Sequence, residues 1–318
     1  MKVWVTGAGG FVATYLINHC LECGDDVFAS FRHKPPQEIL NQLKKKISTF
    51  YYDILKPDEF PLILRDVKLD AVINLAGVSS LDKTLRAPEE TLNINTFGAV
   101  ELLRLLKKYQ PRSRVLFVSS GGVYDSSLCP SNGFPETHQC APSNLYLMTK
   151  YMMEKMVIYA NNQCEMDIVI ARPFNHFGPG QDERFVLPSF AAQIARMKIS
   201  KSRRHILKVG NISIERDFLD VIDVVRAYRL LIEKGKKNNI YNISTGKSIS
   251  LKNILDILRE MSGIDFDIKI DPARERAEDP TILKGNPEKI NRHTLWKAII
   301  PLKDTLKKLY DDKVRLCR

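Results

Sequence analysis

The residues most able to carry chemistry are a tyrosine and a lysine four positions apart. Tyr146 and Lys150 stand in the stretch SNLYLMTKYMMEKM, and this spacing places both side chains on one face of a helix. A phenol in isolation titrates near ~10, too high for easy proton exchange at neutral pH, and a neighbouring ammonium lowers that pKa. The pair therefore predicts a tyrosine that acts as an acid or a base.

A second group of reactive side chains precedes this pair. Residues 118–125 read VSSGGVYD, so an apolar run ends in the hydroxyls of Ser119 and Ser120, followed by two glycines and an aromatic ring. A YxxxK spacing alone arises by chance in many proteins. Its place after a strand that ends in serines strengthens the catalytic interpretation.

A glycine-rich turn near the start of the chain indicates a nucleotide site. The first predicted strand runs into TGAGGFVA, which gives Gly7, Gly10 and Ala13 a GxxGxxG/A spacing just before a helix. The first glycine permits a tight turn, the second lets a pyrophosphate approach the backbone, and the small third residue lets helix and strand pack closely. Free N–H groups at the helix amino terminus then face the phosphates. The turn predicts a dinucleotide cofactor.

The end of the second predicted strand discriminates between NAD and NADP. An acidic residue there would accept hydrogen bonds from the adenosine ribose hydroxyls of NAD. The chain instead reads DVFASFRHK, with Ser30 and Phe31 at this place and Arg32 next. A guanidinium pairs with a phosphate in bidentate fashion. We therefore expect NADPH/NADP as cofactor, with Arg32 on its extra phosphate; the alternative is that Arg32 is merely solvated.

The elements that position these residues follow an alternating pattern. Short β-branched runs alternate with amphipathic stretches, as in a parallel sheet with crossover helices, and continuous apolar runs such as AVINLA predict strands covered on both faces. After about Phe174 long apolar strands become fewer. We expect an α/β fold: a doubly wound parallel Rossmann sheet over 1–174 that carries the catalytic Ser, Tyr and Lys, and a smaller C-terminal α/β substrate-binding lobe over 175–318.

Length and composition exclude several classes of protein. A chain of 318 residues that is 44% hydrophobic can bury a sizeable core. No apolar run reaches the ~18 residues of a membrane span, and MKVWVTG lacks a signal-peptide pattern, so we expect a cytoplasmic protein. The six cysteines are scattered, as reduced thiols are, and we expect no metal site. The net charge of +11 suits an anionic small substrate rather than a nucleic acid, because no nucleic-acid motif accompanies it.

Together, the glycine turn, the strand that ends in serines and the YxxxK spacing resemble the extended short-chain dehydrogenase/reductases over nearly the whole chain. The resemblance implies that Ser120, four before Tyr124, hydrogen-bonds the reacting carbonyl oxygen. It implies that Lys150 also contacts the nicotinamide ribose, and that Asn95 lies behind the site. The implied cofactor-binding residues are Gly7, Gly10, Phe11, Val12, Arg32, Asp53, Ile54, Leu75, Ala76, Tyr146, Lys150 and Pro173.

The second half of the chain resembles the branch of this family that acts on GDP-mannose derivatives, through the words FNH, GPGQ, FV, GN and RDF. In that branch Arg216 would hold the diphosphate; the alternative is an ion pair with one of the aspartates that follow it. A further diphosphate arginine is expected within DPARERAEDPT, either Arg274 or Arg276, with Arg276 preferred. The implied substrate-binding residues are Ser79, Ser80, Asn175, Phe185, Val186, Asn211, Arg216 and Arg276.

The two glycines after Ser120 bear on the reaction. Members of the family that dehydrate nucleotide sugars carry carboxylates here, as TDE or TSE, and use them to remove water. Gly121 and Gly122 have no proton to give. The resemblance thus implies an NADP-dependent oxidoreductase, a nucleotide-sugar 4-ketoreductase that acts on a 4-keto-6-deoxy hexose or heptose, with GDP as the preferred nucleotide.

Three alternatives stay open at this point. A nucleotide-sugar 4-epimerase needs the same serine, tyrosine and lysine but keeps its cofactor bound through both half-reactions. A 4,6-dehydratase would lack its acids, and a non-catalytic nucleotide-sensing protein would have no use for the three residues. The sequence leaves the sugar, the product stereochemistry and the base open.

Two predicted helices carry more apolar residues than one sheet face covers. In residues 146–160 apolar side chains occur almost all round, and residues 90–108 are nearly as rich. A large exposed apolar flank is rare in monomers, and members of the family pair these helices as a four-helix bundle about a twofold axis. We therefore expect a homodimer, with Met153 in its interface.

Overall fold

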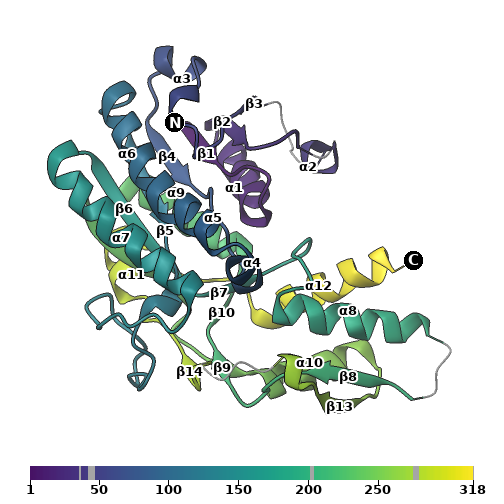
Figure 1. Ribbon diagram of the computed structural model, residues 1–318. Coiled ribbons are helices and arrows are strands. Elements are labelled where there is room, and N and C mark those ends of the chain that lie inside the picture. The colour runs from purple at the N-terminus through teal and green to yellow at the C-terminus, as the bar shows by residue number, and fades with distance from the viewer. Residues whose placement is uncertain (36, 42–46, 201–203, 275–278, 318) are drawn as a thin grey trace.

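The structure, a computed structural model, describes residues 1–35, 37–41, 47–200, 204–274 and 279–317. Within these residues, seven parallel strands form one sheet in the order β11-β6-β5-β4-β1-β2-β3 (Figure 1). They are β1 Lys2–Thr6, β2 Asp26–Phe31, β3 Ser48–Tyr51, β4 Ala71–Asn74, β5 Arg114–Val118, β6 Asp167–Pro173 and β11 Asn239–Ile243. The order reverses between β1 and β4, as in a doubly wound Rossmann sheet. The predicted fold class is confirmed.

Helices cover both faces of this sheet, as the continuous apolar strands require. On one face α1 (Phe11–Glu22) packs against α9 (Val221–Lys234), and on the other α6 (Gly98–Tyr109) packs against α7 (Leu145–Cys164). Each face encloses its own apolar cluster. With both faces covered, a ligand must approach the sheet along an edge.

A smaller lobe lies at the lower right of Figure 1 and encloses a third apolar cluster. Its main elements are α8 Val186–Ile199, β8 Ile206–Val209, α10 Leu251–Ser262, β13 Asp267–Ile270 and α12 Leu302–Leu316. The expected division at residue 174 needs a correction, because β11 and α9 come from beyond it and complete the main sheet and one of its helical layers. The second half of the chain therefore serves both lobes.

Short elements connect these parts. β7 pairs with β10, and β9 pairs with both β12 and β14, so the chain crosses between sheet and lobe several times. The short elements are α2 Gln37–Asn41, η1 Pro57–Glu59, α3 Ile63–Asp66, α4 Leu81–Arg86, α5 Pro88–Leu92, the π-helical η2 Asn93–Phe97, η3 Gly121–Val123, β7 Asn175–Phe177, β9 Glu215–Arg216, β10 Phe218–Asp220, β12 Ile249–Ser250, η4 Pro272–Arg274, β14 Ile282–Leu283 and α11 Glu288–Thr294.

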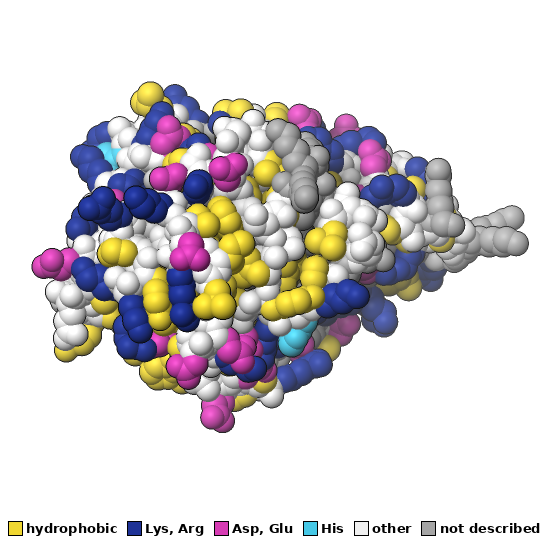
Figure 2. Space-filling model, turned by 90° about the horizontal axis from the view of Figure 1, so that it is seen from above, with side chains coloured by type: hydrophobic (Ala, Val, Ile, Leu, Met, Phe, Trp, Pro, Cys, Tyr) yellow, Lys and Arg dark blue, Asp and Glu magenta, His cyan; other side chains and the backbone are white. Residues whose placement is uncertain are grey.

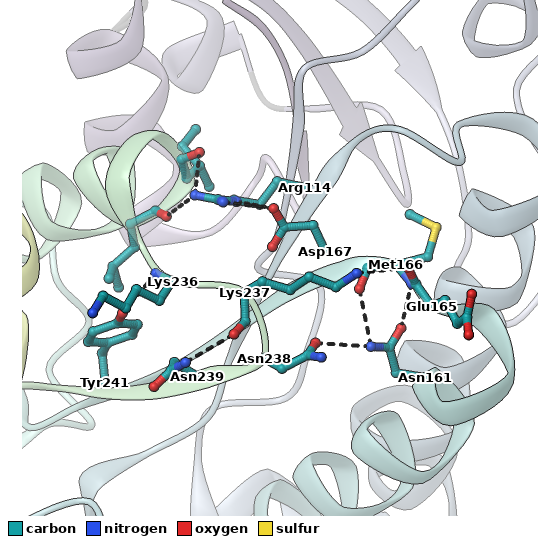
Figure 3. Close-up of polar contacts among 12 residues, drawn as sticks. Arg114, Asn161, Glu165, Met166, Asp167, Lys236, Lys237, Asn238, Asn239 and Tyr241 are labelled. Carbon is teal, nitrogen blue, oxygen red and sulfur yellow. Dashed lines mark hydrogen bonds and ion pairs between the residues drawn. The ribbon is translucent and has the colours of Figure 1, made fainter.

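Polar contacts at the amino ends of three neighbouring strands fix their relative positions (Figure 3). Arg114, at the start of β5, donates to the carboxylate of Asp167, at the start of β6, at 2.7 and 2.9 Å. Asn161 of α7 donates to the main-chain oxygen of Met166 at 3.2 Å and to Oδ1 of Asn238, just before β11, at 3.1 Å. These contacts hold β5, β6 and β11 in one register, so their carboxyl ends reach the same edge of the sheet.

The surface carries its charges mixed. On the face seen in Figure 2, Lys and Arg side chains are spread among acidic and hydrophobic ones rather than gathered in a single patch. Among the described residues, no helix combines the length and apolar character that crossing a membrane requires. No group of His, Cys, Asp and Glu within that part of the chain is arranged to hold a metal ion.

Candidate active site

A cavity of about 910 Å³ runs along the carboxyl edge of the sheet, where the smaller lobe covers it. Its volume lies at the upper end of the ~300–1,000 Å³ typical of ligand sites, and this edge is where doubly wound sheets bind ligands. The sequence-predicted residues on its wall are Gly7, Gly10, Phe11, Val12, Leu75, Ser79, Ser80, Ser120, Tyr146, Lys150, Pro173, Asn175, Phe185, Val186, Asn211 and Arg216. One cavity thus brings together most of the residues expected for cofactor, catalysis and substrate.

Five predicted residues are not placed on this wall. Ala76 follows β4 behind the glycine turn, and Ile54 is buried in the cluster beneath α6. Arg32 and Asp53 lie beyond the carboxyl ends of β2 and β3, outside the cavity. Arg276 lies outside the described residues.

The glycine turn has the geometry that an anion site needs. Gly7 adopts φ +64°, and a side chain there would place its Cβ 2.7 Å from the main-chain nitrogen of Ala76. Gly10 donates to the carbonyl of Gly7 at 3.0 Å and is the N-cap residue of α1. The first turn of α1 has no side-chain cap and no acidic residue. Its main-chain N–H groups are therefore available to the phosphates of a dinucleotide.

A buried hydroxyl beside the cavity has no hydrogen-bond partner in the described part of the chain. Ser119 is buried at the end of β5 and lines the cavity, yet its Oγ has no hydrogen-bond partner among the described residues. Buried polar groups nearly always have a partner. This Oγ has almost no accessible surface, so it is not exposed to the cavity.

Arg32 is held by two carboxylates. Its guanidinium donates to Asp53 at 3.2 Å and to Glu90 of α5 at 2.9 Å, with the arginine side chain 40% exposed. The neighbouring Ser30 is buried and accepts a hydrogen bond from Nε1 of Trp4 at 3.0 Å, so it is bound within the core. Arg32 is therefore held by two ion pairs beyond the carboxyl end of β2 instead of being merely solvated.

Tyr146 and Lys150 face the cavity from one side of α7, as their spacing predicts. The side chain of Asn144 caps this helix by accepting from the N–H of Leu147 at 3.0 Å. Lys150 Nζ donates to the main-chain oxygen of Val118 at 2.9 Å, which ties the helix to the end of β5. The ammonium is thus held beside the strand that carries the predicted serine.

Ser120 stands on the adjoining wall with its hydrogen unused within the turn. Its Oγ caps η3 by accepting from the N–H of Gly122 at 3.2 Å. A hydroxyl that accepts one hydrogen bond still has its own hydrogen to donate. Ser120 could therefore polarise a carbonyl oxygen in the cavity.

Asn95 supports this wall from behind, within the π-helical turn η2. Its amide donates to Val78 O at 3.1 Å and to Oγ1 of Thr149 at 3.0 Å, and it accepts from the N–H of Val78 at 2.8 Å. Thr149 lies on α7 just before Lys150. Asn95 therefore fixes α7 against the loop after β4.

Loss of contact with water shifts the pKa values of Tyr146 and Lys150. This raises the pKa of Tyr146 to about 12 and lowers the pKa of Lys150 to about 8, with the nearby Glu154 carboxylate opposing the second shift. Burial alone causes the shift of Tyr146, so the pKa of this phenol lies above its ordinary value and not below it as the pairing with Lys150 predicts. The phenol stays protonated at neutral pH, ready to donate a proton.

The two glycines after Ser120 are closely packed. A Cβ on Gly121 would lie 2.6 Å from the ring of Phe174, and a Cβ on Gly122 would lie 2.8 Å from a methyl group of Leu147. Phe174 is buried against Tyr124, whereas Leu147 is only half-buried. The glycines therefore do more than omit a carboxylate, because they also let the turn approach β6 and α7.

The remaining predicted substrate residues come from both lobes. Ser80 caps α4, accepting from the N–H of Lys83 at 3.1 Å. Phe185 precedes α8, and Val186 begins it. The side chain of Asn211 closes a turn by accepting from Ser213 N at 2.9 Å. These segments place polar and apolar groups side by side along the wall.

Arg216 is buried on the wall of the cavity. It donates to the main-chain oxygens of Glu215 at 2.8 Å and Pro280 at 2.7 Å, and it lies 3.5 Å from the carboxylate of Asp279. The alternative of a structural ion pair thus has a different partner, because the aspartate within ion-pair distance is Asp279 and not one of those that follow Arg216. Those aspartates bind other elements: Asp217 accepts from Thr245 and Gly246, Asp220 caps α9, and Asp223 accepts from Ile299 and Ile300.

Arg274 does reach the cavity, where it donates to Ser189 at 3.2 Å and pairs with Asp271 at 3.4 Å. Sequence reasoning missed other residues on the wall. Two of them, Arg184 and Arg196, pair with Asp182 and Glu183. His176, Gln181 and Tyr228 are three further residues with polar side chains on this wall.

These residues gave little signal in the sequence. Tyr228 sits at a core position of the amphipathic helix α9 and is 1% exposed, so its spacing indicated packing alone. His176 and Gln181 stand in the sequence motifs FNH and GPGQ, which served here only as evidence of the resemblance to the family. A polar residue within such a motif is the signal that could have found them.

Comparisons with known proteins find relatives over nearly the whole chain. The family model for GDP-mannose 4,6 dehydratase matches residues 4–309. The chain is 32% identical to GDP-6-deoxy-D-mannose reductase of Pseudomonas aeruginosa over 98% of its own length and 96% of the relative's. It is 28% identical to GDP-6-deoxy-D-talose 4-dehydrogenase of Aggregatibacter actinomycetemcomitans, covering 91% and 90%. A solved structure of RMD from Pseudomonas aeruginosa, complexed with NADPH, superposes with a TM-score of 0.81 at 30% identity, covering 99% and 98%.

The packing of the two glycines generates a prediction for stability. We expect Gly121→Ala to lower the free energy of unfolding by about 1–3 kcal/mol, the usual cost of overpacking a core, because the Phe174 ring must move. Gly122→Ala is the matched control and should cost less, because the end of the Leu147 side chain can rotate away. Urea denaturation of both variants measures the difference, and equal losses would contradict this account of the turn.

Proposed function

Because the chain belongs to the GDP-mannose 4,6 dehydratase family of nucleotide-sugar-modifying, NAD(P)-dependent short-chain dehydrogenase/reductases, we propose that it reduces the 4-keto group of a nucleotide-linked 4-keto-6-deoxy sugar. The observation that carries the proposal is the wall formed by Ser120, Tyr146 and Lys150, followed by a turn that has no carboxylate. Such a wall serves hydride transfer at one carbon.

Each of the three residues has a defined task in this reaction. Ser120 donates a hydrogen bond to the carbonyl oxygen, and Tyr146 gives its proton to the alkoxide that develops there. An alkoxide is a stronger base than a phenolate, so a phenol with a raised pKa still serves as the acid. The Lys150 ammonium stabilises the phenolate left behind. Bound NADPH supplies the hydride.

The turn at Gly121 and Gly122 favours reduction over dehydration, although the family is named after a dehydratase. Removal of water from the sugar needs an acid and a base beyond the tyrosine. At Gly121 and Gly122 the chain offers neither, and their closest neighbours are the apolar side chains of Phe174 and Leu147. GDP is the proposed nucleotide, since the reductase and the 4-dehydrogenase that resemble the chain carry it in their names.

NADPH is the proposed cofactor on the strength of Arg32. This guanidinium lies just beyond β2, where a ribose phosphate would lie. It is planar and has several N–H donors, so it can bind a phosphate and a carboxylate at the same time. The solved relative complexed with NADPH supports the same choice.

A homodimer through α6 and α7 completes the proposal. α7 exposes Met148, Ile158 and Tyr159, and Tyr159 is 73% exposed, so the helix presents an apolar outer surface. The expectation that Met153 lies in the interface is wrong, because this side chain is 2% exposed within the core beneath the helix. A twofold contact of the outer surfaces would cover the exposed group.

Turnover of the proposed substrate tests the proposal directly. We expect the protein to consume NADPH with freshly made GDP-4-keto-6-deoxymannose and to give a 4-hydroxy product. Tyr146→Phe should abolish reduction while leaving nucleotide binding nearly unchanged, because it removes only the proton donor. Ser120→Ala should cost about 10²–10³ in kcat, as loss of an oxyanion donor does elsewhere. Interconversion of GDP-sugars without net NADPH oxidation would instead indicate an epimerase.

The lowered pKa of Lys150 predicts the alkaline limit of the reaction. The lysine is an ammonium below its pKa of about 8 and a neutral amine above it. We therefore expect kcat/KM for reduction to fall as the pH rises through about 8. Lys150→Arg should be slower, yet flat from pH 7 to pH 9, because a guanidinium keeps its charge. A wild-type profile without the alkaline fall would show that this charge is not used.

The role of Arg32 is measured by cofactor preference. Arg32→Ala should lower kcat/KM with NADPH by about 10- to 100-fold, the value of a hydrogen bond to a charged group, and should leave NADH nearly unaffected. Lys34→Ala is the control, because Lys34 is an exposed cation close by in the chain. A wild-type preference for NADH would overturn the choice of cofactor.

The dimer is tested on the exposed side of α7. Ile158→Lys places a charge in the proposed interface and should shift the protein from dimer to monomer in sedimentation at micromolar concentration. Ile270→Lys is the matched control, because Ile270 is an exposed isoleucine on β13 in the other lobe. A wild-type protein that already sediments as a monomer would contradict the assembly.

A further inference from the structure

One flank of the reacting carbonyl group is formed by a glycine and a leucine. Oγ of Ser120 accepts from the N–H of Gly122 at 3.2 Å, and a Cβ built on Gly122 would lie 2.8 Å from a methyl group of Leu147. Leu147 is half-buried, lines the cavity and follows Tyr146 in α7. The two residues proposed to bind the carbonyl oxygen thus have the same apolar neighbour.

This apolar flank suits one side of the proposed sugar better than the other. On either side of the C4 carbonyl, C3 carries a hydroxyl group, whereas C5 of a 6-deoxy sugar carries a carbon, C6, without oxygen. An apolar carbon is most stable against apolar groups, and Gly122 and Leu147 offer no polar side-chain atom. The missing side chain of Gly122 also leaves room there. The flank therefore fits C5 and C6.

Two serines lie at the same end of the cavity. Ser126 and Ser143 are half-buried and line it, and Ser143 comes just before Asn144, the N-cap residue of α7. An antiparallel bridge between Tyr124 and Cys140 holds the segments of the two serines together. Both hydroxyls therefore come from adjacent segments near the amino end of α7.

The polar groups of these residues are free to bind a ligand. The hydroxyls of Ser126 and Ser143 have no hydrogen-bond partner among the residues that the structure describes, and each keeps some exposed surface. Asn144 uses its Oδ1 to accept from the N–H of Leu147 at 3.0 Å, so its Nδ2 points away from that bond as a donor. A ligand hydroxyl, which both donates and accepts, matches such a set.

Several other polar groups on the wall already bind the protein itself. Ser80 caps α4. From α12, Lys313 donates to the carbonyl of Gln181 at 3.0 Å, and Asp312 accepts from the N–H of Gly180 at 3.0 Å, which fixes that loop. The corner at the amino end of α7 differs from these places, because its hydroxyls have only water or a ligand to bind.

We propose that the substrate is a heptose, a 4-keto-6-deoxy sugar with seven carbons, whose C7 hydroxyl binds in the corner formed by Ser126, Ser143 and Asn144. In a 6-deoxyhexose C6 is a methyl group, which offers these polar groups nothing. In a 6-deoxyheptose C6 is a methylene group, and C7 beyond it carries a hydroxyl. The inference rests on the proposed function, because it takes Ser120 and Tyr146 to bind the C4 carbonyl.

A comparison of two keto sugars tests the proposal. With NADPH, we expect kcat/KM for GDP-4-keto-6-deoxyheptose to exceed that for GDP-4-keto-6-deoxymannose by about 10- to 100-fold. A site that hydrogen-bonds a substrate hydroxyl discriminates against the analogue that lacks it, and water entering this half-buried corner limits the ratio. An equal or lower kcat/KM for the heptose overturns the proposal while leaving the proposed reaction intact.

Two serine substitutions assign the preference to this corner. Ser126→Ala and Ser143→Ala should each lower kcat/KM for the heptose by about 2- to 10-fold, the value of one hydrogen bond, and leave the hexose within about twofold of wild type. Ser127→Ala is the matched control, because Ser127 is exposed in the same loop and is not on the cavity wall. Equal losses with both sugars would show that the serines do not bind C7, and the inference would be wrong.

A binding measurement separates this inference from the proposed function. If neither keto sugar is reduced, the proposed function fails, and calorimetry with the 4-hydroxy sugars GDP-6-deoxyheptose and GDP-6-deoxymannose then decides the inference. Tighter binding of the heptose that is lost in Ser126→Ala and Ser143→Ala supports the corner as its site. Equal affinities, or no binding of either sugar, overturn it. Thermal unfolding of the variants near the wild-type temperature shows that any loss is local.

Discussion

A buried ion pair between Arg172 and Glu154 is the constraint on which the site depends. The guanidinium donates to the carboxylate at 2.6 and 2.9 Å, and the two side chains are 4% and 1% exposed. Two charges taken out of water at such a distance need each other, since either one alone would be strongly destabilising. Glu154 lies one helical turn beyond Lys150, and Arg172 comes just before Pro173. The pair therefore sets the distance between α7 and β6, the strand that ends at the cavity.

The strands, the glycine turn and the Tyr146–Lys150 face could be predicted from the sequence, because each follows from local spacing. Residue 174 as a division could not, since β11 joins the sheet through pairing with a distant strand. The burial of Met153 in the core, instead of in an interface, could not be predicted for a related reason. On a helix that is apolar almost all round, composition does not say which side faces the core. The pairing of Arg32 with Glu90 also depends on segments far apart in the chain.

The arginines on the cavity wall already have acidic partners. The four described arginines on its wall are Arg184, Arg196, Arg216 and Arg274, and each lies within ion-pair distance of a carboxylate. A diphosphate that binds here replaces or shares those carboxylates instead of meeting bare charge. The net charge of +11 therefore overstates the attraction at the site itself. Carboxylates that hold the guanidinium groups in place also reduce the ordering that binding requires.

The contact of α12 with the loop at 180–181 has a consequence for the order in which the protein assembles. Gly180 and Gln181 are made well before Asp312 and Lys313, which hold them. During synthesis the amino-terminal part of a chain emerges first. The turn at Gly7 and Gly10 has therefore left the ribosome before α12 can hold the loop at 180–181 in place. β11 likewise arrives late to the sheet. Contacts between such distant segments slow folding, and the nascent chain must wait for α12 before this wall of the cavity is supported.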